Sequence, residues 1–200
     1  AWVSERKDVL SGLFFFLLLL AYAGYARAPS VGRYLVALLC LALGLAAKPM
    51  LVSAPLVLLV LDLFVLHRGE RGLARLALEK LPFVALALGS ALLTVHAQRA
   101  GGALNTLEFL PLEARLANAP IAALTYLGHF FWPTELAYFY PHRALAGAEP
   151  RAFDASAWLA LLGLLGLVAL AWRLRWRAAL VTAGFLWFLV MLAPVIGIVQ

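Results

Sequence analysis

Charged residues are scarce in this chain. Asp, Glu, Lys and Arg make up 13% of its 200 residues, whereas about 25% is usual in a soluble domain. Hydrophobic residues account for 65% of the sequence, and no soluble repeat or low-complexity linker is evident. This composition excludes an ordinary soluble domain and predicts an integral membrane protein.

Cysteine is almost absent, since Cys40 stands alone inside an apolar run. A single cysteine excludes an intrachain disulfide, and no Cys/His spacing typical of a metal site occurs. A nucleophile–base pair and a phosphate-binding loop are also missing from the sequence. The net charge of +6 could indicate nucleic acid, but no soluble part combines basic patches with interleaved aromatic residues. Membrane lipid is the expected partner, and nucleic acid is not.

Six long apolar runs follow one another along the chain. They are too long and too uniformly apolar for barrel strands, so each predicts a transmembrane helix. The expected fold class is therefore all-α, a polytopic transmembrane helical bundle with about six crossings. The expected spans are residues 9–26, 34–47, 50–66, 81–97, 157–172 and 180–199. The chain begins at Ala1 without a charged leader and ends at Gln200 after an apolar run, so we expect a fragment of a longer polytopic protein.

Lysine and arginine predict the orientation, because cytoplasmic loops carry an excess of both. Six single crossings place three basic groups on one side, which is expected to be the cytoplasm. These groups are Arg27 with Arg33, residues 67–80, and Arg173 with Arg175 and Arg177. Residues 4–8, Lys48 and residues 98–156 fall on the extracytoplasmic side, and the expected localisation is multi-pass in the inner (plasma) membrane.

Residues 112–132 resemble a seventh span. A crossing there would move the arginines of residues 173–177 to the outside, against the positive-inside bias. The segment also carries Glu113, Arg115 and His129, and Pro120 interrupts its apolar pattern. An external interfacial or re-entrant helix is therefore favoured over a crossing.

Charged and aromatic side chains gather on the predicted extracytoplasmic side. Lysine and arginine at a membrane mouth are suited to phosphate, such as that of a lipid-linked sugar donor. The candidate ligands of the donor phosphate are Arg6, Lys7, Lys48, Arg99 and His142, with Glu5, Asp8 and Tyr140 in supporting roles. Ordinary structural roles stay open for all of them: interfacial anchoring for the cations and aromatics, and helix-dipole compensation for the two acidic residues.

Asp62 is a carboxylate inside the third apolar run. An ionisable residue at membrane depth is a functional candidate by default. Because Asp62 lies near the expected cytoplasmic end of its run, a role in helix packing or at the interface is favoured.

Six segments together resemble one bacterial family of polytopic membrane proteins. The family combines a glycosyltransferase-like membrane half with C-terminal tetratricopeptide repeats (TPR). It is similar to the transmembrane-and-TPR O-mannosyltransferases of animals and belongs with the C-type glycosyltransferase (GT-C) superfamily. The segments are AWVSERKDVLSGLFF, AKPMLVSAPLVLLVLD, EKLPF, AQRAGG, YLGHFFWPTELAYFYPH and FLWFLVMLAPVIGIVQ, in this order.

The resemblance implies a GT-C-like enzyme that uses a polyprenyl-phosphate-linked sugar and a protein acceptor. Sugar would pass to Ser or Thr on the extracytoplasmic face, with an acidic catalytic base upstream of Ala1 and the repeats downstream of Gln200. On this reading the 200 residues form a partial membrane domain that is inactive alone. No cofactor is implied beyond a possible divalent cation. The alternatives are a non-catalytic scaffold that presents TPR repeats and, less favoured, a transporter fragment, since no internal repeat is evident.

Overall fold

A computed structural model of the chain describes residues 6–100, 111–134 and 153–197. Within these ranges all regular secondary structure is helical, so the all-α class is confirmed. The elements are α1 (Arg6–Arg27), α2 (Val31–Ala47), the 3-10 helix η1 (Pro49–Ser53), α3 (Ala54–Phe64), the 3-10 helix η2 (Arg68–Arg71), α4 (Leu73–Ala100), α5 (Leu112–Phe131), α6 (Ala155–Leu174) and α7 (Ala179–Leu192).

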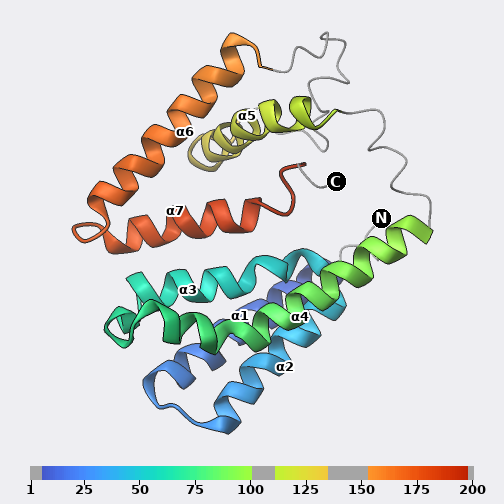
Figure 1. The fold of residues 1–200 in the computed structure, drawn as a ribbon, viewed down its shortest axis with the longest axis vertical. Coiled ribbons are helices and arrows are strands. Elements are labelled where there is room, and N and C mark those ends of the chain that lie inside the picture. The colour runs from blue at the N-terminus through green and yellow to red at the C-terminus, as the bar shows by residue number, and fades with distance from the viewer. Residues whose placement is uncertain (1–5, 101–110, 135–152, 198–200) are drawn as a thin grey trace.

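Figure 1 shows two groups of helices. Helices α1 to α4 pack into one bundle, and α5 to α7 form a second group that joins it where α7 lies along α3. Within the second group, α6 packs against both α5 and α7.

The helices of the first group alternate in direction. α1 and α2 form an antiparallel hairpin, in which Asp8 at the start of α1 pairs with Lys48 directly after α2. α3 then returns, and its Asp62 accepts a hydrogen bond from Tyr22 near the end of α1. We refer to these two ends of the bundle as the Lys48 end and the Asp62 end.

α7 runs opposite to α3. At the beginning of α3, Ser53 Oγ lies 3.3 Å from Met191 Sδ, whereas the rings of Phe64 and Trp176 are 6.4 Å apart at its other end. The basic turn of residues 173–177 therefore lies at the Asp62 end. The α1–α2 turn and η2 lie there too, so the basic connections are grouped as the sequence predicted.

Within the part of the chain that the structure describes, three helices are long and apolar enough to cross a membrane, namely α1, α4 and α6. α2, η1 with α3, and α7 are apolar but shorter, at 10–17 residues. α5 has 20 residues and is not among the candidate spans of the described chain. Length and composition thus indicate a membrane protein, while the count of six crossings stays a prediction.

Two helices differ in extent from the predicted spans. α4 begins at Leu73, before the span expected from residue 81, so most of the basic connection 67–80 is helical, in η2 and the first turns of α4. The reason is that residues 73–80 (LARLALEK) are nearly all strong helix formers. α7 ends at Leu192, before the predicted end of the apolar run at residue 199, because Pro194 has no backbone N–H to continue the helical hydrogen bonds.

Pro120 does not break α5. α5 continues through this residue from Leu112 to Phe131, at the cost of one backbone hydrogen bond. α5 packs on α6, where Leu124 lies beside Gly163. Its last turns lie beside the second half of α6, which a re-entrant helix allows and a purely interfacial one does not, and the re-entrant assignment stays a prediction.

Apolar side chains are found on both sides of the helices. The core of the first group contains Leu18, Leu41, Leu58 and Phe83, all fully buried. Many other large apolar side chains face outward, and Ala157 is the only buried residue of α6. A bundle with an apolar exterior fits a lipid surrounding.

α2 packs tightly against α1 and η1 at Gly44. A Cβ atom at this position would lie 3.3 Å from Phe14 Cβ and 2.6 Å from Leu51 Cδ1. Small residues permit such close helix packing inside membranes. Gly44 therefore fixes how tightly the α1–α2 hairpin closes.

Gly44→Leu should destabilise the folded protein by about 1–3 kcal/mol, because the larger side chain on α2 would push α1 and η1 away from α2. The measurement is the temperature at which purified protein in detergent loses its monodisperse peak. Gly24→Leu is the matched control, since its Cβ would meet nothing within 4 Å. Equal losses in both variants would contradict the close packing at Gly44.

Candidate functional site

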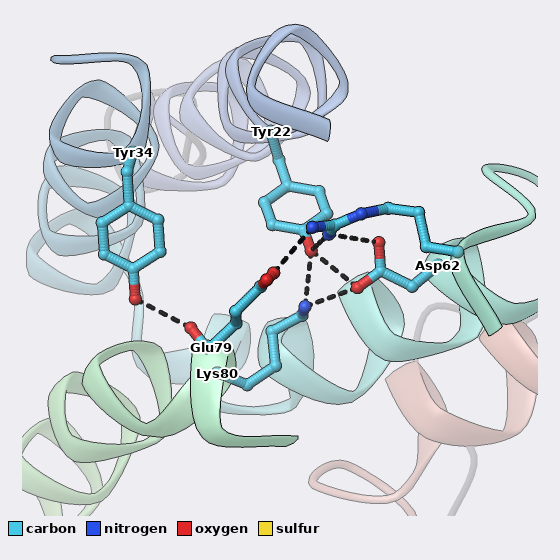
Figure 2. Close-up of polar contacts among 6 residues, drawn as sticks. Tyr22, Tyr34, Asp62, Glu79 and Lys80 are labelled. Carbon is cyan, nitrogen blue, oxygen red and sulfur yellow. Dashed lines mark hydrogen bonds and ion pairs between the residues drawn. The ribbon is translucent and has the colours of Figure 1, made fainter. Parts of the chain in front are cut away.

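Five side chains from four elements form a buried polar cluster at the Asp62 end. We refer to it as the Asp62 cluster, and Figure 2 shows it with Tyr34 beside it. Its members are Tyr22 of α1, Asp62 of α3, Arg68 of η2, and Glu79 and Lys80 of α4.

A tight connection carries Arg68 back into the bundle. His67, before η2, has φ of 52°, and Gly72, after it, has φ of 83°. Such left-handed backbone is cheap for glycine and more common for histidine than for most residues. The two residues bracket η2 and turn the chain between α3 and α4.

The carboxylate of Asp62 is fully buried and accepts from three donors. Arg68 Nη1 donates to Oδ1 at 3.0 Å, and Tyr22 Oη donates to Oδ2 at 2.6 Å. Lys80 Nζ lies 2.5 Å from Oδ2. α1, η2 and α4 are thus all fixed to one carboxylate on α3.

Tyr22 and Glu79 complete the network. The Tyr22 hydroxyl accepts from Arg68 Nη1 at 2.7 Å and from Lys80 Nζ at 2.5 Å. Arg68 Nη2 donates to Glu79 Oε2 at 2.8 Å. Tyr34 Oη donates to the Glu79 backbone carbonyl at 2.7 Å and so ties α2 to the start of α4.

The Asp62 cluster has two positive and two negative groups, so its formal charge is zero. Burial lowers the pKa of Arg68, but hydrogen bonds and charge interactions with Asp62 and Glu79 outweigh it, so the pKa is raised and Arg68 stays charged. Arg68 Nε is the one buried side-chain nitrogen or oxygen of the described residues that lacks a partner. A neutral network that joins four elements is suited to holding helices together, in agreement with the packing role expected for Asp62.

The predicted donor-phosphate residues lie at the opposite end. Asp8 and Lys48 form an ion pair whose side chains are 38% and 29% exposed. Arg6 and Lys7 precede Asp8 in the first turn of α1, and both are exposed. The structure thus brings three candidate cations and Asp8 to the same end of the α1–α2 hairpin.

Arg99 lies in the last turn of α4, which runs parallel to α2 from the Asp62 end. From Glu79 to Arg99 the helix rises about 30 Å, whereas α2 rises about 20 Å from Tyr34 to Lys48. Arg99 therefore lies toward the Lys48 end of the bundle.

The remaining candidates, Glu5, Tyr140 and His142, lie outside the described residues. In the part of the chain that the structure describes, no group of three or more His, Cys, Asp or Glu side chains could hold a metal ion. Among the described residues, the ion pair between Lys48 and Asp8 is the only ion pair at the Lys48 end.

Sequence reasoning missed the partners of Asp62. Arg68, Glu79 and Lys80 stand in the basic stretch 67–80, which the sequence predicts as a cytoplasmic connection. The available signal was the carboxylate itself, since a buried charge requires a nearby opposite charge. Arg68 and Lys80 follow it by 6 and 18 residues.

Asp62→Asn should destabilise the protein by about 3–5 kcal/mol, because it leaves Arg68 and Lys80 buried with too little negative charge. The measurement is thermal unfolding in detergent. Tyr34→Phe, which removes one hydrogen bond to a backbone carbonyl, should cost only about 1 kcal/mol.

A charge-balanced double variant tests the electrostatic explanation. Asp62→Asn with Lys80→Met keeps the cluster neutral, with Arg68 still paired to Glu79, and should be more stable than Asp62→Asn alone. If the double variant loses the full sum of the two single losses, charge balance is not what the cluster depends on.

Comparisons of the chain with protein-family models, with curated proteins and with solved structures give no match. The functional assignment therefore depends on the residues themselves. At the Asp62 end they form a buried polar network. At the Lys48 end, among the described residues, Lys48 pairs with Asp8, and the exposed Arg6 and Lys7 precede that carboxylate.

Proposed function

We propose that the chain is the membrane part of a GT-C-like glycosyltransferase in the inner (plasma) membrane. It transfers a sugar from a polyprenyl-phosphate-linked donor to Ser or Thr of a protein on the extracytoplasmic face. The bundle has about six crossings, and the Lys48 end opens to that face. TPR repeats and the first external loop belong to the same protein, as the resemblance implies.

The observation that carries this proposal is the Asp8–Lys48 pair beside Arg6 and Lys7. These residues are separated by one helical hairpin in sequence, yet they share one end of the bundle. A lipid-linked phosphate lies at headgroup level with its tail in the bilayer. Ammonium and guanidinium groups at a helix end are placed to bind such a phosphate.

The chemistry assigned to these residues is stabilisation of the leaving group. The acceptor hydroxyl oxygen attacks the anomeric carbon, its proton passes to an acidic base upstream, and the bond to the phosphate oxygen breaks. Polyprenyl phosphate leaves with the electron pair. Lys48 and Arg6 bind the charge that grows on that oxygen, and Asp8 orients Lys48 before the donor arrives.

A non-catalytic scaffold is the second candidate. The observation in its favour is that Asp8 already neutralises Lys48, so the pair needs no ligand to be stable. On this reading the pair only closes the α1–α2 hairpin.

Lys48→Ala and Arg6→Ala should each lower sugar transfer by about 10²-fold or more, because each removes a cation from the leaving phosphate. The assay uses the full protein in membranes and follows radiolabelled mannose from a polyprenyl phosphate onto protein. Arg75→Ala, which removes an exposed arginine at the Asp62 end, is the control and should leave transfer unchanged.

Asp8→Asn separates the two candidates. If Lys48 binds phosphate, freeing it should keep or increase donor binding. If the pair is only structural, Asp8→Asn and Lys48→Ala should lower thermal stability alike and leave transfer at the wild-type rate, and the proposed function would then be wrong.

Orientation has its own test. Single cysteines at positions 7, 70 and 177 in a Cys40→Ala background are treated in intact cells with an impermeant thiol reagent. Position 7 should be labelled, while positions 70 and 177, on the basic connections, should be protected. Labelling at 70 with protection at 7 would reverse the proposed orientation.

A further inference from the structure

An apolar groove lies between the last turns of α5, the second half of α6 and most of α7. Its volume is about 500 Å³, within the usual range of small-molecule sites. Each of the three helices lines one side of the groove, with Phe131 on α5, Leu170 on α6 and Trp187 on α7. The Thr182 hydroxyl in its lining donates to the Ala171 carbonyl at 3.1 Å, so it needs no ligand.

Arginines stand at one end of this groove. Leu174 and Ala178, which line it, flank the basic turn between α6 and α7. Arg175 is held in place there, because its Cζ lies 4.3 Å from the centre of the Trp172 ring and its Nη1 donates to the Trp172 carbonyl at 2.8 Å. Arg173 and Arg177 are exposed, and neither forms an ion pair with a described residue.

The groove has the depth of one leaflet. Its lining along α7 extends from Ala178 to Phe188, ten residues apart, which is about 15 Å of helix. The hydrocarbon core of a bilayer is about 30 Å thick. Trp172 and Trp176, both exposed, mark the turn as the headgroup level, where tryptophan is enriched. The groove thus extends from the headgroups to about the middle of the bilayer.

We propose that this groove binds one anionic phospholipid of the leaflet that the α6–α7 turn faces. An acyl chain occupies the apolar groove, and the phosphate and headgroup lie against Arg173, Arg175 and Arg177. Basic residues next to a membrane surface attract anionic lipid. The bound lipid also joins α5 to the α6–α7 hairpin.

Charge decides between a lipid and a second copy of the chain. A helix from another copy could cover the apolar walls, but it would leave three guanidinium groups without an anion. A phospholipid supplies both an acyl chain for the apolar groove and a phosphate for the arginines of the adjoining turn. The site lies at the Asp62 end, so it does not depend on the donor site proposed at the Lys48 end.

The test is native mass spectrometry of the purified full chain with matched amounts of phosphatidylglycerol or phosphatidylcholine. The wild type should retain one phosphatidylglycerol per chain in preference to phosphatidylcholine. Replacing the three arginines with glutamine should weaken phosphatidylglycerol binding by about fivefold for each residue and leave phosphatidylcholine unchanged. Replacing them with lysine keeps the charge and should retain most of the preference.

Gly184→Leu tests the groove itself. Gly184 lines it, and a Cβ there meets nothing within 4 Å, so leucine fills the groove without a backbone clash and should abolish binding of both lipids. Gly166→Leu, equally unhindered and outside the lining, is the matched control. Equal binding of the two lipids to the wild type, or wild-type binding by Gly184→Leu, would overturn the proposal. If the wild-type chain forms a dimer and Gly184→Leu dissociates it, the groove binds a second copy of the chain instead of a lipid.

Discussion

The carboxylate of Asp62 is the constraint on which the first group of helices depends. It is fully buried and accepts from side chains of α1, η2 and α4. A buried charge is costly to leave unpaired, so these elements cannot separate from α3 without exposing it to an apolar surrounding. Tertiary structure at this end is therefore specified by charge and hydrogen bonding as well as by packing.

The two ends of the bundle differ in how their charges are used. The Asp62 cluster balances Arg68 and Lys80 with Asp62 and Glu79, and its groups bond to one another. At the Lys48 end, the described residues include Asp8, which pairs with Lys48, and the exposed cations Arg6 and Lys7 in the same turn of α1. An excess of exposed positive charge is what an anionic ligand requires, which is why the proposed function is assigned to the open end.

The amino-acid pattern predicted the helices well and their interactions less well. Long apolar runs and the grouping of Arg and Lys were enough to predict helices and the end at which each connection lies. They could not predict that α4 starts at Leu73, because strong helix formers and basic residues coincide in that stretch. The pattern was also insufficient for the Asp62 cluster, since pairing across four elements depends on helix rotation, which composition does not determine.

Of the candidate site at the Lys48 end, the sequence predicted which residues share that end but not the contact between them. Lys48 and Asp8 could be placed at one end from the number of apolar runs between them, because each run reverses the chain. Their direct pairing could not, since it requires the close approach of α1 and α2 at Gly44. The groove beside α7 was missed entirely, because it is formed by three helices whose relative packing no local pattern records.

The order of the Asp62 cluster along the chain has a consequence for biogenesis. During translation α3 emerges with its aspartate while Tyr22 is the only partner already made. An unpaired aspartate costs about 2.5–3.5 kcal/mol at the centre of a membrane helix and less near its end, where Asp62 lies in the 11-residue α3. Its cationic partners follow only with η2 and the beginning of α4. α3 and α4 are therefore suited to leave the translocon together as a hairpin, with the ion pairs closing as they enter the lipid.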